Sequence, residues 1–195
     1  MKIISVDPSI NPENFVMAFF KESKLSSYST ARDYQVSGEN RLRSIYEAGW
    51  SCAIGEDILI IDYPSMTPYA KSSRGSRPMN SKALALNHQA IGAFLAGANL
   101  PDDNIIKWNS AKHKVNKEMV RRAMISKYNL PANTKDHVTD AIYRGGWLVE
   151  MLKRYDLKTI KAGEEGIKKS KVKAGMKTYI TTTALRLARI LKHGF

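Results

Sequence analysis

Two short, mostly apolar runs, each followed by an aspartate and by a proline one or two residues later, constrain the fold of this chain more than any other feature. Residues 3–6 precede Asp7 and Pro8, and residues 58–61, Ile-Leu-Ile-Ile, precede Asp62. A continuous run of β-branched and other apolar residues is typical of a strand that is covered on both faces, as in a parallel sheet. The sequence therefore predicts a layered α/β fold with Asp7 and Asp62 at the carboxyl ends of two strands.

The remaining periodicity predicts a mixed five-stranded sheet, with three antiparallel strands and then two parallel ones, flanked by helices. Short connections between the first three strands favour an antiparallel meander. The strands are expected over residues 3–6, 15–20, 25–36, 58–61 and 105–108. Helical spacing of apolar residues predicts helices over residues 39–55, 81–98, 110–128 and 134–155.

Charge is distributed unevenly along the chain. The 195 residues carry a net charge of +13, and the last 43 residues hold 12 basic but only 3 acidic side chains. We expect one compact domain over residues 1–155 and a basic extension over residues 156–195, with a mobile linker over residues 157–172 and a helix over residues 179–191. The extension is expected to contact DNA, and a solubilising role is the alternative.

The composition also limits where the protein can work. Cys52 is the only cysteine, which excludes an intramolecular disulfide and a cysteine-based metal cluster. No stretch approaches the roughly 18 apolar residues of a membrane span. We therefore expect a soluble protein of a reducing compartment such as the cytoplasm, with no membrane partner.

Several acidic side chains are expected to converge at one edge of the sheet. Neighbouring strands lie about 4.8 Å apart, so Asp7 and Asp62 meet if their strands are parallel neighbours. Asp136, His137 and Asp140 occupy the first turns of the late helix; His137 and Asp140 share a face, and Asp136 suits the helix dipole. Carboxylates gathered in this way require a cation, and they favour Mg²⁺ or Mn²⁺. With a basic chain, a metal-dependent phosphodiesterase is the natural interpretation.

Three ordered motifs resemble the acidic motifs of RuvC-like Holliday junction resolvases, especially the phage type. They are Ile-Ile-Ser-Val-Asp7-Pro-Ser, Ile-Leu-Ile-Ile-Asp62-Tyr-Pro and Asp136-His137-Val-Thr-Asp140-Ala-Ile-Tyr. The resemblance covers about residues 1–155 and implies an RNase H-like fold. In such a family Asp7, Asp62, His137 and Asp140 are the catalytic metal ligands, with two ions in each site.

The resemblance also implies a homodimer that cuts two opposed strands of a four-way DNA junction symmetrically. Family members commonly place Glu where this chain has Asp62. The wedge residue of some members has no clear match here, and Met66 and Tyr69 are the candidates. A phage-infected host cytoplasm, or another reducing compartment that contains DNA, is the expected location.

Other surfaces are assigned by charge and side-chain size. The small-residue helix over residues 81–98 is the candidate dimer surface. We expect the three tryptophans to serve packing and His113 to face solvent. Several basic residues are expected to contact DNA phosphates, and the alternative is that they are ordinary solvent-exposed charges of a loop or helix. These residues are Lys71, Arg74, Arg77, Lys112 and Lys114.

Two further functional hypotheses stay open. A nuclease of the same fold can act on flaps, RNA–DNA hybrids or packaging substrates, because the phosphodiester chemistry is shared. A non-catalytic nucleic-acid-binding module is the other alternative, and a spatial partner for the acids, such as Arg144, would favour it.

Overall fold

The computed structural model describes most of the predicted nuclease domain. The described residues are 2–34, 40–55, 57–64, 81–109, 113 and 115–165. The helix expected over residues 179–191 lies outside them. Within these ranges, no helix is both long enough and apolar enough to pass through a membrane.

The five strands form one mixed sheet in the order β3-β2-β1-β4-β5. The antiparallel pairs are β1 with β2 and β2 with β3, whereas β1 pairs with β4, and β4 with β5, in parallel. This arrangement confirms the predicted RNase H-like sheet. The strands are β1 (Lys2–Asp7), β2 (Val16–Lys21), β3 (Lys24–Thr30), β4 (Ile58–Asp62) and β5 (Ile105–Trp108).

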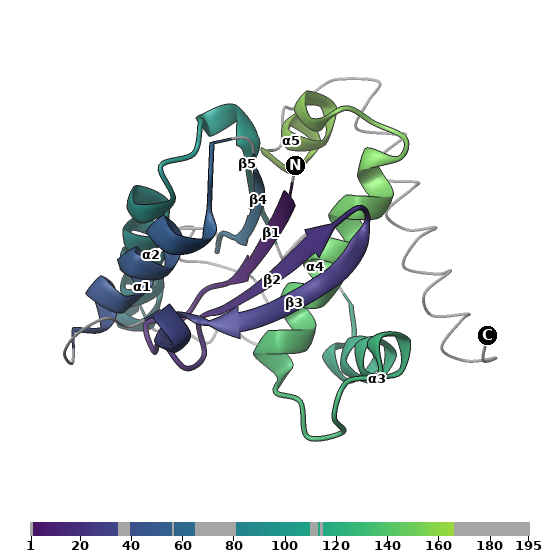
Figure 1. Cartoon of the computed structure of the whole chain (residues 1–195), viewed down its shortest axis with the longest axis horizontal. Coiled ribbons are helices and arrows are strands. Elements are labelled where there is room, and N and C mark those ends of the chain that lie inside the picture. Colours follow the sequence, from purple (N-terminus) through teal and green to yellow (C-terminus); the bar gives the residue numbers. More distant parts are fainter. Residues whose placement is uncertain are drawn as a thin grey trace.

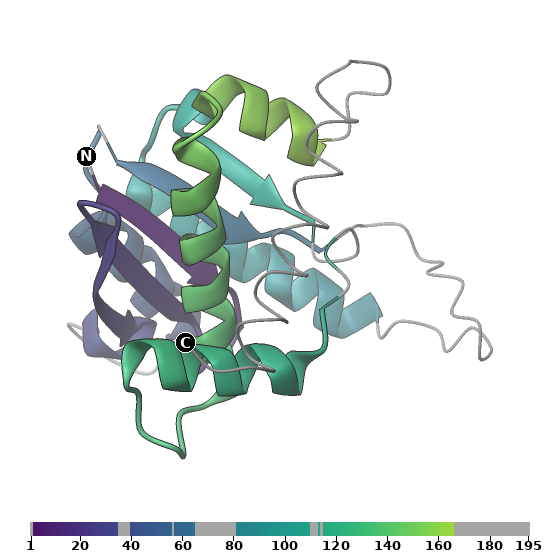
Figure 2. The ribbon, with the colours of Figure 1, turned by 90° about the vertical axis from the view of Figure 1, so that its right-hand side faces the viewer.

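Helices cover both faces of this sheet. One face carries α1 and α2, and the other carries α4 with α3 and α5 near its ends (Figures 1 and 2). The helices are α1 (Arg41–Cys52), α2 (Ser81–Ala98), α3 (Lys117–Tyr128), α4 (Asp136–Leu152) and α5 (Leu157–Glu165).

Two element boundaries differ most from the sequence-based prediction. The third strand ends at Thr30 and passes into a 3₁₀ helix (Ala31–Tyr34), in which the Asp33 carboxylate accepts a hydrogen bond from the Thr30 backbone N–H. Helix α3 begins at Lys117, because the Asn116 side chain accepts a hydrogen bond from the Met119 backbone N–H and caps the helix there.

Strand alternation divides the apolar residues between two buried cores. Ile4 and Val6 pack toward α1 and α2, whereas Ile3 packs toward α4. Side chains two residues apart share a face, so Asp7 at the end of β1 lies on the α4 side. The same alternation in β4, where Ile58 and Ile60 pack toward α4, sets Asp62 on that side as well.

Helix α5 lies where a mobile linker was expected, so that expectation is wrong for residues 157–165. Ile160 is fully buried, and Glu164 Oε1 lies 3.0 Å from Nε2 of His113 in an almost fully buried pair. The imidazole of His113 stacks on Trp108 with 3.5 Å between ring centres. His113 therefore belongs to the interior, contrary to the expectation that it faces solvent. The domain boundary after residue 155 stays a prediction.

Helices α1 and α2 pack unusually closely because each presents a glycine to the other. A Cβ on Gly97 would lie 2.0 Å from the Tyr46 carbonyl oxygen, and one on Gly49 would lie 2.3 Å from that of Phe94. Part of the small-residue pattern of α2 is thus used within the chain. Trp50, expected in packing, is instead 71% exposed, whereas Trp108 and Trp147 are buried as expected.

Replacing Gly97 by alanine should lower the free energy of unfolding by about 1–3 kcal/mol, because the new methyl group forces the two backbones apart. Gly92 on the same helix has no atom within 4 Å of the position that a Cβ would occupy. Gly92→Ala should therefore leave stability unchanged or raise it by up to about 1 kcal/mol through lower backbone entropy. Urea denaturation of both variants measures the contrast; equal effects would contradict the close approach.

Candidate active site

Three separate segments bring charged side chains to the carboxyl end of the sheet. Asp7 ends β1, Asp62 ends β4, and these strands are parallel neighbours with Val6 paired to Ile61. Helix α4 crosses the same end of the sheet and contributes a row of polar side chains spaced three and four residues apart, on one helical face. The row consists of His137, Asp140 and Arg144.

Asp7 is the most buried carboxylate of the site, with 10% of its side chain exposed. Nδ1 of His137 lies 2.6 Å from its Oδ2, and Nη2 of Arg144 lies 3.0 Å from its Oδ1. Burial alone would raise the pKa of Asp7, but the hydrogen bond with His137 and the charge of Arg144 outweigh it and lower the pKa. Asp7 is therefore an ionised carboxylate held inside the protein.

Arg144 is the centre of the cluster and has only 5% of its side chain exposed. Its Nη1 donates a hydrogen bond to the Val6 carbonyl oxygen at 2.7 Å, and its Nη2 lies 3.3 Å from Oδ2 of Asp62. The next residue is Gly145, where a Cβ would lie 2.2 Å from the Phe20 ring. The absence of a side chain there lets α4 approach the sheet closely enough for Arg144 to reach both strand ends.

Asp140 lies on the outer side of the cluster and pairs with Lys117 of α3. Nζ of Lys117 donates a hydrogen bond to Oδ2 of Asp140 at 3.2 Å. Burial raises the pKa of Asp140, and the negative charge of Asp7 raises it further. The charge of Asp140 in turn raises the pKa of Lys117, whose side chain is 78% exposed. The carboxylates of Asp140 and Asp7 are therefore close enough to repel each other electrostatically.

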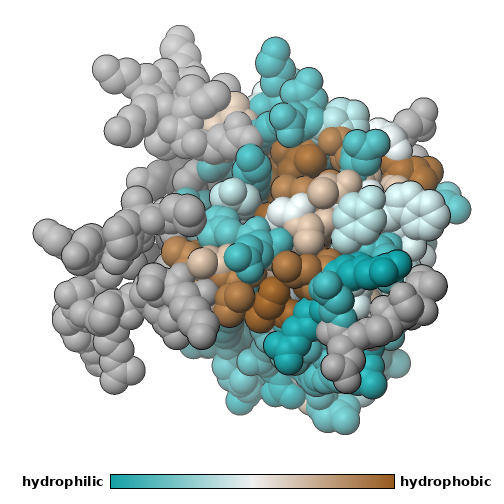
Figure 3. Space-filling view, turned by 90° about the vertical axis from the view of Figure 1, so that its left-hand side faces the viewer, coloured by the Kyte–Doolittle hydropathy of each residue, from teal (hydrophilic) through white to brown (hydrophobic). Residues whose placement is uncertain are grey.

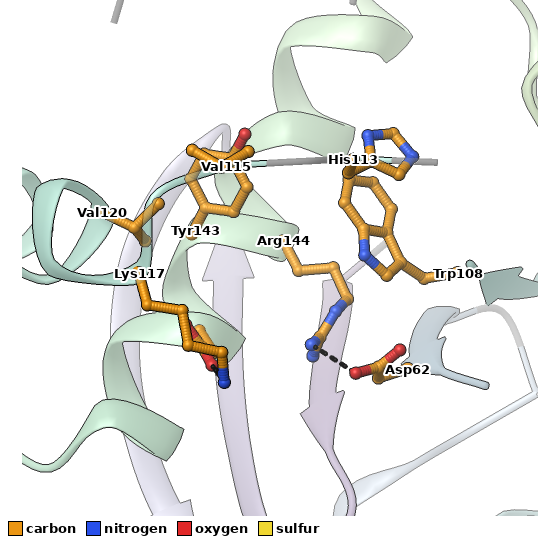
Figure 4. Close-up of a pocket in the computed structure, with 9 residues that line it drawn as sticks. Asp62, Trp108, His113, Val115, Lys117, Val120, Tyr143 and Arg144 are labelled. Atoms are coloured by element: carbon orange, nitrogen blue, oxygen red, sulfur yellow. Dashed lines mark hydrogen bonds and ion pairs between the residues drawn. The ribbon is translucent and has the colours of Figure 1, made fainter. Parts of the chain in front are cut away.

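A cavity of about 270 Å³ opens beside the acids (Figure 4). Arg144 and Lys117 project into it from two helices, and Asp62 enters from the end of β4 (Figure 4). Its walls combine charge with aromatic surface. The charged and larger aromatic residues of its lining are Asp62, Asp140, Lys117, Arg144, Trp108 and Tyr143; His113, Val115 and Val120 complete it.

The acids have the chemistry of a magnesium site but not its geometry. Carboxylate oxygens are the ligands that Mg²⁺ prefers. Yet among the described residues, which include all four predicted ligands, no three His, Cys, Asp or Glu side chains are placed so that they could hold a metal ion. The cation that contacts both Asp7 and Asp62 is the guanidinium of Arg144. As arranged, the side chains do not fit a shared divalent ion.

The sequence thus identified side chains that gather at one end of the sheet. Asp7, Asp62, His137 and Asp140 all lie there, and Asp136 lies outside it, paired with Arg121 at 3.4 Å. The sequence named Arg144 only as an example of a spatial partner for the acids, under the non-catalytic alternative, and did not predict its central position; its spacing from His137 and Asp140 was the available signal. Other predicted residues lie outside the described ranges; they are Met66, Tyr69, Lys71, Arg74, Arg77, Lys112 and Lys114.

Comparison with solved structures finds a likeness to a Holliday junction resolvase. RuvC of T. thermophilus, solved in complex with a Holliday junction substrate, superposes with a TM-score of 0.49 at 14% sequence identity. The match covers 79% of this chain and 97% of that chain. No family model and no curated protein matches the sequence. The class of fold, RNase H-like, therefore rests on the sheet order and register described above.

The Asp7–His137 pair makes stability depend on pH. The hydrogen bond with Asp7 raises the pKa of His137 in the folded protein. The contribution of His137 to the free energy of unfolding is therefore complete below the ordinary histidine pKa of about 6.5, and it is lost as pH rises through the raised pKa of the folded state. The pKa of Asp7 is lowered in the folded protein, so the contribution of Asp7 to the free energy of unfolding is complete above pH 3.8 and is lost as pH falls through the lowered pKa. The pair should stabilise the metal-free protein most between these limits.

A double-mutant cycle with His137→Gln and Asp7→Asn tests this dependence. Urea unfolding of the four proteins should give a coupling free energy that is largest near pH 6 and declines steadily toward alkaline pH. A coupling that is constant across this range would contradict the ion pair.

Proposed function

We propose that the protein is a structure-selective endonuclease that hydrolyses phosphodiester bonds in branched DNA, above all in four-way junctions. The observation that carries this proposal is the convergence of Asp7, Asp62, Asp140 and His137 from β1, β4 and α4 at one end of an RNase H-like sheet. In open α/β sheets this end is where ligands bind. The motif resemblance to RuvC-like resolvases names the same four residues.

Dependence on Mg²⁺, with Mn²⁺ as a substitute and two ions in each site, is part of the proposal. It rests on the hard oxygen donors of the three carboxylates. Since the side chains as arranged do not form such a site, metal binding requires a change in the contacts of Arg144. Lys117 is exposed at the rim of the cavity and is well placed to meet a backbone phosphate.

A specific observation favours the non-catalytic alternative as the second candidate. Arg144 and Lys117 already provide ion-pair partners for all three acids, as they would if these carboxylates only stabilised the fold. Such a module would bind nucleic acid without Mg²⁺ and hydrolyse nothing. Flap, hybrid and packaging nucleases share the chemistry of the first proposal and differ from it only in the DNA shape that is bound.

Cleavage of synthetic DNA discriminates these functions. With Mg²⁺, the full chain should cut a four-way junction at paired symmetric positions, faster than it cuts a flap, an RNA–DNA hybrid or a linear duplex. Asp7→Asn should bind the junction but cleave it at least about 100-fold more slowly, because an essential carboxylate charge is lost. Product mapping on sequencing gels and a binding assay measure the two effects.

Asp103→Asn is the matched control, since the Asp103 carboxylate is fully exposed and precedes β5, at the opposite end of the parallel strands from Asp62. It should cleave at the wild-type rate. Undiminished cleavage by Asp7→Asn would remove the nuclease proposal for this site. Binding without any cleavage by the wild type, whichever metal is added, would establish the non-catalytic module instead.

The face formed by α1 and α2 supports the proposed homodimer. Apolar side chains gather on this face (Figure 3), and three large ones on or just after α1 are strongly exposed. These are Tyr46, Trp50 and Ile54. An exposed patch of this kind marks an interaction site, and a twofold dimer would use it on both copies. The proposed surface therefore includes α1 as well as the small-residue helix α2.

Placing a charge in this patch tests the dimer. Trp50→Glu should convert a dimer into a monomer in sedimentation velocity, because a carboxylate would be buried in an apolar interface. Met119→Glu makes the same kind of change at an exposed apolar residue of α3 and should leave the dimer intact. Dissociation by both variants, or by neither, would contradict the assignment of this surface.

A further inference from the structure

The charges of the candidate active site are already balanced by the protein itself. Asp7, Asp62 and Asp140 supply three negative charges when ionised, whereas Arg144 and Lys117 supply two positive ones. Protonated His137 adds a third positive charge next to Asp7. A divalent cation added to this set would leave an excess of positive charge, so one of the protein cations has to give up its partners.

Arg144 is the cation that occupies the position between Asp7 and Asp62 that a shared divalent ion would need. Its Nη2 contacts both Asp7, at 3.0 Å, and Asp62, at 3.3 Å, and these are the two strand-end acids that a shared ion would have to join. Among the described residues, the ion-pair partner of Lys117 is Asp140, which it meets from an exposed position. A guanidinium and a divalent ion cannot both lie between the same two carboxylates.

The hydrogen bonding of Arg144 is incomplete. Nη1 and Nη2 have partners, but the buried Nε has none among the residues that the structure describes. A buried donor without a partner costs free energy, of the order of 1–3 kcal/mol. The guanidinium is therefore retained by its charge attraction to the two acids and by the Val6 carbonyl, not by a complete set of hydrogen bonds.

From this geometry we infer that Arg144 is a built-in counter-cation, which holds Asp7 and Asp62 together in the metal-free protein and which a divalent ion has to displace. The inference rests on the proposed function for the identity of the ion, Mg²⁺. Arg144 is thus a positioning residue. It holds the buried Asp7 and the half-buried Asp62 close together until the ion arrives, and it weakens metal binding by competing for the same oxygens.

The displaced guanidinium then needs a new anionic partner. The cavity beside it opens toward Lys117 and Asp140, and a DNA phosphate entering there would meet Arg144 directly. Metal and DNA should consequently bind with positive coupling, because the phosphate offsets the loss of the Asp7 and Asp62 contacts.

Metal titration of the DNA-free full chain tests the competition. Calorimetry with Mg²⁺ at constant neutral pH should give a dissociation constant at least about ten-fold lower for Arg144→Gln than for the wild type. This is the scale on which a neighbouring arginine changes proton binding by a carboxylate. The same variant should melt at a lower temperature than the wild type without metal, and Mg²⁺ should raise its melting temperature by more.

Arg122→Gln is the matched control, because it removes an arginine whose partner is Glu118 on the exposed surface of α3. It should bind Mg²⁺ as the wild type does. Arg144→Lys, which keeps the charge, should stay close to the wild type in metal affinity. If Arg144→Gln folds only when Mg²⁺ is present, replacement of the arginine by the metal is supported.

Two results would overturn the inference. One is Mg²⁺ binding by Arg144→Gln that is no tighter than that of the wild type. The other is an Arg144→Gln protein that stays unfolded in excess Mg²⁺. Neither measurement involves DNA or cleavage, so a failure of the competition is distinguishable from a failure of the proposed nuclease activity.

Discussion

The ion pairs of Arg144 with Asp7 and Asp62 are the interaction on which the functional end of the molecule depends. A carboxylate that is 90% removed from solvent is strongly disfavoured unless a cation and hydrogen bonds accompany it. Arg144 meets this need for two strands at once and also bonds the Val6 carbonyl oxygen, so it ties α4 to the ends of β1 and β4. Removing it would expose an uncompensated charge inside the protein.

The polarity of the sheet and the position of the acids could be predicted because they follow from local patterns. Short, mostly apolar runs identify β1 and β4, and a proline one or two residues after each aspartate marks where the strands end. Period-two alternation then sets Asp7 and Asp62 on the same face, toward α4. The strands and their ends are set by residues that are neighbours in the sequence, whereas the parallel pairing of β1 with β4 was a condition of the prediction, which the structure meets.

What could not be predicted depends on contacts between distant segments. Arg144 is 137 residues from Asp7, and its helical spacing from His137 and Asp140 does not tell whether it faces the acids or solvent. The His113–Glu164 pair spans 51 residues and draws α5 onto the sheet, although the Lys-rich sequence around α5 is typical of a solvated segment. In both cases tertiary packing decides the outcome, which local composition does not record.

Charge at the candidate active site is distributed differently from charge in the rest of the chain. Around the acids, cations and carboxylates nearly cancel, so this region alone gives little long-range attraction for a polyanion. The net charge of +13 lies mainly elsewhere, with most of the excess after residue 152. In the proposed binding of DNA, long-range attraction and salt dependence are therefore expected to arise from charges outside the candidate active site. Within the site, the balance between Arg144 and the acids governs which cation is held, because buried charges are screened much less by salt.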